Sequence, residues 1–72
     1  MTPAEIRAAR IALGLNQPDM AAMLGYGRVR QRVAAIEAGT VKPHGAVTRL
    51  LRAYLDGYRP SDWPGAERGE TP

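Results

Sequence analysis

The sequence predicts an all-α protein that folds as one small domain. Apolar residues recur at spacings of three and four residues in four successive segments, and no segment shows the alternation of a half-buried strand. Each of these segments is followed by a glycine, the residue that most readily takes the left-handed conformation at a helix C-terminus. A chain of 72 residues suffices for one domain with a small core.

The first helix is expected to begin at Pro3 and to end before Gly14. Thr2 is a good N-cap, Pro3 fits the first helical position, and Glu5 completes a capping box. Helical spacing gives this segment one inward face, which contains Ile6, Ala9, Arg10 and Leu13. Leu15 follows the terminal glycine and is expected to pack back against the helix as a plug.

The second helix is expected to start at its N-cap, Asn16, and to end at Gly25. Pro18 lacks an N–H group, which is harmless in the first turn of a helix. Asp19 suits the positive end of the helix dipole in the same turn. The link to the next helix is short, so the two helices must turn sharply.

The third helix is expected to run from about Arg28 to Ala38, before Gly39. On a helical wheel, its inward face contains Val29, Val33 and Ile36. Its outward stripe contains Arg28, Gln31, Ala34, Ala35 and Ala38, and the two flanks of this stripe carry Arg30 and Arg32. Hydrogen-bond donors are therefore concentrated in the first half of the outward face, and the second half is reduced to methyl groups.

This asymmetry suits insertion of the third helix into the major groove of DNA. The groove is about 12 Å wide and admits a helix, so alanines let the backbone approach where bulky side chains would hold it away. Arginine pairs bidentately with guanine, and glutamine pairs in the same way with adenine. A basic face that only contacts water has a similar composition, so this helix alone leaves both interpretations open.

A fourth helix is expected to begin between His44 and Ala46 and to end at about Asp56. The chain then divides into a helical domain (1–57), a Pro-rich aromatic segment (58–64) and a disordered tail (65–72). Three aromatic residues gather near this boundary: Tyr54, Tyr58 and Trp63. They either cover the core of the monomer or form an interface between two copies, where Trp and Tyr are enriched.

Composition excludes most catalytic and metal chemistry. The chain has no cysteine and a single histidine, so it offers no disulfide, no Cys-type zinc site and no nucleophile–base pair. We therefore expect no enzyme activity, no cofactor, no metal and no small-molecule ligand. The sequence lacks both the roughly 20 apolar residues of a membrane span and a signal-peptide pattern, so a cytoplasmic protein is expected.

The distribution of charge favours a polyanionic partner. The formal net charge is +3, and the basic residues between Arg28 and Arg52 are accompanied by one acidic residue, Glu37. The acidic residues Asp56, Asp62, Glu67 and Glu70 lie toward the C-terminus instead. A basic middle and a more acidic end suggest one surface that faces nucleic acid.

One ordered set of motifs resembles the Cro/C1-type (XRE) helix-turn-helix family of regulators, which includes phage repressors. The motifs are RIALGLNQ at 10–17, LG at 24–25, IEAG at 36–39 and Pro43. The resemblance implies a lambda-repressor-like bundle of four or five helices that binds double-stranded DNA with sequence specificity, as a homodimer on a palindromic operator. We therefore expect a small transcriptional repressor, and its own operon is one candidate target. Anti-CRISPR-associated repressors are similar in size and plan.

The resemblance also implies roles for individual positions. Arg30, Gln31 and Ala35 match base-reading positions, while Gln17, Thr40 and Lys42 match contacts to the DNA backbone. Together with the helical wheel, this gives an expected base-reading set of Arg28, Arg30, Gln31 and Ala35. The expected backbone set is Asn16, Gln17, Arg32, Thr40 and Lys42. Arg10 and Glu37 match an internal ion pair between the first and third helices and are expected to be structural.

The sequence departs from the family pattern before the third helix. Two extra residues fall around Tyr26–Arg28, and the usual Ser or Thr N-cap is missing. Either the turn is longer or the helix gains length at its start, which leaves open whether Arg28 enters the groove or contacts phosphates. An alternative function of another class is a protein-interaction module, such as an antitoxin or adaptor with the same fold.

Overall fold

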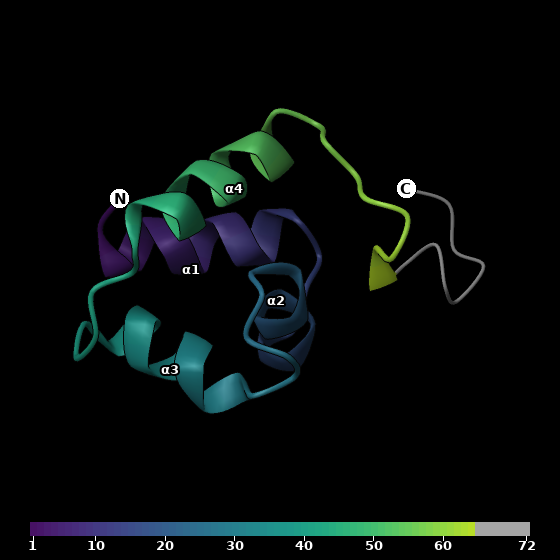
Figure 1. The fold of residues 1–72 in the computed structure, drawn as a ribbon. Coiled ribbons are helices and arrows are strands. Elements are labelled where there is room, and N and C mark those ends of the chain that lie inside the picture. Colours follow the sequence, from purple (N-terminus) through teal and green to yellow (C-terminus); the bar gives the residue numbers. More distant parts are fainter. Residues whose placement is uncertain (65–72) are drawn as a thin grey trace.

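The computed structural model describes residues 1–64, which form a compact domain of four α-helices without strands (Figure 1). The helices are α1 (Pro3–Ala12), α2 (Gln17–Met23), α3 (Arg30–Ala38) and α4 (Gly45–Leu55). The all-α fold predicted from periodicity is therefore confirmed. α3 packs against both α2 and α1, and Figure 1 shows α3 and α4 at opposite edges of the bundle. The expected disordered tail, 65–72, lies outside the described residues.

The first two helices begin as their N-terminal residues predict. The Thr2 hydroxyl accepts a hydrogen bond from the backbone N–H of Glu5 at 3.1 Å, and the Glu5 carboxylate accepts one from the backbone N–H of Thr2 at 2.7 Å. Asn16 caps α2 by accepting a hydrogen bond from the N–H of Asp19 at 2.8 Å. These contacts satisfy backbone donors that have no partner inside the helix.

The core lies where the four helices meet. Its largest fully buried apolar side chains come from three different helices: Met20, Val33 and Leu51. Leu15 is buried as the expected plug, and the Tyr54 hydroxyl donates a hydrogen bond to the carbonyl of Met23 at 2.5 Å. This last contact joins α4 to the C-terminal end of α2.

The start of α3 differs from the sequence prediction. The helix begins at Arg30 and not at about Arg28, and Val29 is its N-cap residue. Val29 is 49% exposed, so its assignment to the inward face was wrong. Gly25 and Gly27 adopt left-handed conformations, with φ of 87° and 64°. These two residues turn the chain before α3 starts. Residues 24–29 therefore form the turn between α2 and α3.

The segment after α4 folds back onto the core. Trp63 is only 7% exposed and meets Tyr54 edge-on, with ring centroids 5.1 Å apart. Arg59 fixes this path, because its guanidinium donates to the Tyr54 carbonyl at 2.8 Å and lies 4.4 Å from the centroid of the Trp63 ring. Tyr58 stacks on Tyr54 but remains 55% exposed. Tyr54 and Trp63 thus complete the monomer's core, whereas Tyr58 faces outward.

Candidate nucleic-acid interface

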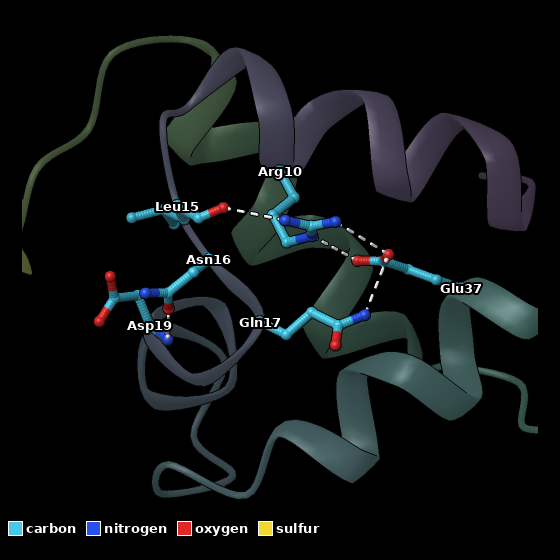
Figure 2. A network of polar contacts seen from close by, with 6 residues as sticks. All are labelled: Arg10, Leu15, Asn16, Gln17, Asp19 and Glu37. Atoms are coloured by element: carbon cyan, nitrogen blue, oxygen red, sulfur yellow. Dashed lines mark hydrogen bonds and ion pairs between the residues drawn. The ribbon is translucent and has the colours of Figure 1, made fainter.

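An ion pair between Arg10 and Glu37 joins α1 to α3 (Figure 2). Arg10 Nε lies 2.7 Å from Glu37 Oε2, and Arg10 Nη2 donates to Oε1 of the same carboxylate at 3.3 Å. The third contact of this arginine is Nη1 donating to the carbonyl of Leu15 at 3.1 Å. A bidentate pair of this kind has one preferred geometry, so it fixes how α3 lies against α1.

The start of α2 joins the same network. Gln17 Nε2 donates to Glu37 Oε1 at 3.5 Å, the longest of these contacts (Figure 2). Both charged side chains of the pair are largely covered, with exposed fractions of 15% for Arg10 and 7% for Glu37. One carboxylate therefore connects α1, α2 and α3. Gln17, expected to contact the DNA backbone, is half-buried here with its amide directed at α3.

The first turn of α3 presents polar side chains to solvent. Arg30, Gln31 and Arg32 are all exposed, and no side-chain hydrogen bond within the described residues engages Arg30 or Gln31. Ala34 and Ala35 follow on the same helix and are half-buried. The asymmetry expected from the sequence, donors first and methyl groups later, is thus present on the folded helix.

Arg28 does not belong to the outward stripe of α3 on which the helical wheel placed it. It lies in the turn between α2 and α3, and its Nη1 donates to Oδ1 of Asp19 at 3.1 Å. The helix starts two residues later, so the wheel does not apply to this position. The structure brings Arg28 to α2 and leaves Arg30 as the first arginine of the helix.

Four of the residues predicted to contact DNA line one shallow hollow: Gln31, Arg32, Ala35 and Lys42. The hollow has a volume of about 190 Å³ and is bounded by α3, the turn before it and the loop after it. Its other lining residues are Tyr26, Val29, Ile36, Val41 and His44. The exposed apolar side chains of Val29 and Val41 were missed as site residues, because neither lies on the outward face of a predicted helix.

The edges of this hollow are held by local contacts. The Arg32 guanidinium lies 6.0 Å from the centroid of the Tyr26 ring, which connects α3 to the preceding turn. The Thr40 hydroxyl donates to the carbonyl of Ala35 at 3.1 Å, which ties the following loop to the end of α3. Tyr26 therefore acts as a support for an arginine, a role that the sequence did not predict.

A larger hollow of about 420 Å³ shares Ile36, Val41 and Lys42 with the smaller one. Its lining is mainly apolar and comes from the N-terminus, α1, Ile36 of α3 and residues 39–43. Of the residues predicted to contact DNA, it includes Thr40 and Lys42. It contains no arginine and no residue from the first turn of α3, so it lacks the donor pattern that marks the smaller hollow.

The described part of the chain offers no other chemistry of note. Within residues 1–64, no group of three or more His, Cys, Asp or Glu side chains is placed to hold a metal ion. No helix in this part has the length and apolar character needed to cross a membrane. Comparisons of the sequence with protein-family models and with curated proteins, and of the fold with solved structures, gave no match.

Proposed function

We propose that this protein is a transcriptional repressor of the Cro/C1 helix-turn-helix type, with a lambda-repressor-like bundle that binds double-stranded DNA as a homodimer. In this proposal α2 and α3 are the helix-turn-helix pair, and α3 enters the major groove of a palindromic operator. The observation that carries the proposal is the hollow that gathers Gln31, Arg32, Ala35 and Lys42 from two separate segments.

The shape of α3 supports groove insertion. Its exposed donors lie in the first turn, the part of a recognition helix that meets base edges. The alanines behind them leave room for the groove wall. The covered ion pair between Arg10 and Glu37 orients the helix before DNA arrives, so little ordering remains to be done on binding.

Each side chain then has a role that fits its position. Arg30 and Gln31 read base edges, because they are exposed and uncommitted at the start of α3. Ala35 contacts a thymine methyl group or leaves space for one. Arg32, Thr40 and Lys42, from α3 and its loop, bind phosphates and fix register. Asn16 and Gln17 at the start of α2 do the same, Gln17 through the amide N–H that it does not donate to Glu37.

Two exposed apolar side chains support a second copy as partner. Leu55 at the end of α4 and Tyr58 just after it are 45% and 55% exposed, whereas Tyr54 before them and Trp63 after them are buried in the core. In Figure 1 this end of α4 lies on the edge of the bundle away from α3. Aromatic residues are enriched where protein surfaces meet, so this patch suits a contact between two repressors.

Selection of bound duplexes from a random DNA library tests the proposal directly. We expect an enriched palindrome whose half-site centres lie about 34 Å apart, one helical turn, as two copies of α3 require. The double variant Arg30→Ala/Gln31→Ala should lose this enrichment. The control Arg7→Ala removes an exposed arginine from α1 and should retain it.

Enrichment of no sequence over the starting library would overturn the proposal. It would favour the protein-interaction module as the function of this fold. Enrichment that survives the Arg30→Ala/Gln31→Ala change would keep DNA binding but remove α3 from the readout.

A further inference from the structure

A buried carboxylate lies against the base of the proposed interface. Asp19, in the first turn of α2, has a side chain that is only 2% exposed. Its partner Arg28 comes from the turn before α3 and is 62% exposed. One end of this ion pair is therefore inside the protein, and the other end is in solvent.

Burial of a carboxylate is costly unless charged or hydrogen-bonding groups compensate it. Arg28 Nη1 donates to Asp19 Oδ1 at 3.1 Å, and this contact holds the guanidinium at a defined place on the surface. A guanidinium has five N–H donors in a rigid plane, so one contact with Asp19 leaves others directed to solvent. Arg28 is thus a fixed donor group, unlike Arg30, which has no such anchor.

The anchor also sets the direction of Arg28. Asp19 lies one helical turn from Asn16, whose side chain accepts a hydrogen bond from the Asp19 backbone N–H at 2.8 Å. Asn16 and its neighbour Gln17 are the residues of α2 that the proposed function assigns to the DNA backbone. The guanidinium of Arg28 therefore lies at the first turn of α2, next to the residues that the proposed function assigns to phosphates, whereas the proposed base-reading side chains belong to α3.

We propose that Asp19 is a positioning residue for DNA binding, which holds Arg28 so that its free N–H groups contact a phosphate beside the start of α2. This inference rests on the proposed function. In this proposal the turn before α3 returns Arg28 to α2. There Arg28 adds a phosphate contact that α3 alone does not provide.

The sign of one effect separates positioning from simple electrostatics. A carboxylate near DNA repels phosphates, so conversion of Asp19 to neutral asparagine should strengthen binding if charge alone matters. If Asp19 positions Arg28, the same change releases the guanidinium and weakens binding. Asparagine keeps the size of the side chain and an acceptor oxygen, so the comparison changes little besides charge.

The test measures affinity of Asp19→Asn for the selected operator and for an unrelated duplex across a range of salt concentrations. We expect binding to both duplexes to weaken about fivefold to tenfold, and the salt slope to fall by about one, as loss of one phosphate contact requires. In an Arg28→Ala background, Asp19→Asn should cause no further weakening. The control Asp62→Asn removes an exposed carboxylate outside the residues assigned to DNA or to the dimer contact and should leave affinity unchanged.

Thermal unfolding of each variant separates loss of fold from loss of binding. If Asp19→Asn does not fold, Arg28→Gln is compared with Arg30→Gln, which removes the same charge two residues away. Arg28→Gln should weaken all duplexes alike, and Arg30→Gln should alter sequence preference.

Three results would overturn the inference. The first is unchanged or tighter binding by a folded Asp19→Asn. The second is unchanged affinity and salt slope in Arg28→Gln, and the third is an Arg28→Gln preference altered at a single base pair, which would make Arg28 a base reader. A wild-type chain that enriches no duplex would remove the proposed function itself, a result that is distinct from all three.

Discussion

At the scale of single residues, Glu37 is the side chain that links the most helices through polar contacts among the described residues. Its carboxylate accepts hydrogen bonds from Arg10 and Gln17 and so connects α1, α2 and α3 at one point. The short motif around Glu37 indicated an ion pair with Arg10, but the contact with Gln17 was not expected. A sequence shows which residues carry opposite charges, whereas a third partner depends on how the helices pack.

Replacement of Glu37 by alanine should destabilise the fold by about 3 kcal/mol, because it leaves the covered Arg10 guanidinium without its partner. Urea unfolding measures the free energy. The double variant Arg10→Met/Glu37→Leu removes both charges and should recover part of the loss. A cost below about 1 kcal/mol for Glu37→Ala would mean that the pair behaves as a surface ion pair.

Glu5 makes the capping box sensitive to acid. The hydrogen bond from the backbone N–H of Thr2 lowers the pKa of Glu5 from its usual 4.5, with a second contribution from the Thr2 hydroxyl. A lowered folded-state pKa gives a stabilisation that is present above pH 4.5 and is lost as pH falls through the folded-state value. Glu5→Gln should therefore flatten the pH dependence of the melting temperature below pH 4.5. An identical acid dependence in both proteins would exclude this role.

At the scale of elements, the turn between α2 and α3 marks where sequence-based prediction reaches its limit. The caps of α1 and α2 were predictable, because Thr2, Glu5 and Asn16 signal helix starts through local contacts. α3 begins without any side-chain cap, so its start left no signal in the sequence. The helical wheel therefore wrongly predicted that the helix begins at Arg28 and that Val29 faces inward. The left-handed backbone conformation of Gly27 delays the start of α3, and the amino-acid composition does not reveal this conformation.

Gln31 is the residue of α3 on which base discrimination is expected to depend. It is exposed in the first turn and lines the hollow, so its amide is free to pair with adenine. Gln31→Ala should cost about 1–3 kcal/mol of discrimination at one or two base pairs while leaving binding to unrelated DNA unchanged. Competition binding with single-base operator variants measures this. A preference identical to that of the wild type would exclude Gln31 from readout.

Lys42 differs from Gln31 because it lies in the loop after α3, at the rim of the same hollow. Lys42→Ala should weaken binding to every duplex and reduce the salt slope by about one, since a phosphate contact carries no sequence information. Titrations at several salt concentrations with operator and random duplexes measure both quantities. Loss of affinity for the operator alone would instead make Lys42 a base reader.

At the scale of the whole molecule, the segment after α4 decides how a chain of this size completes its core. The sequence left open whether the aromatic residues cover the core or form an interface between two copies, and the structure gives different answers for different residues. Tyr54 and Trp63 are buried in the monomer, and Tyr58 faces outward. Arg59 makes the difference by holding the segment to the end of α4 while its guanidinium covers the Trp63 ring. Its role was missed because an arginine in a Pro-rich stretch gives no sign of its partners.

The roles of Trp63 in the core and of Tyr58 in a dimer contact can therefore be tested by separate substitutions. Trp63→Ala should destabilise the monomer by about 3 kcal/mol, because it opens the core beside Tyr54. Tyr58→Ala should cost only about 1 kcal/mol, the value of one stacked pair. If Tyr58 belongs to the contact between two copies, its removal should raise the dimer dissociation constant about tenfold, which sedimentation velocity measures. An unchanged constant in a folded Tyr58→Ala protein would place the dimer contact elsewhere, and a monomeric wild type would remove it.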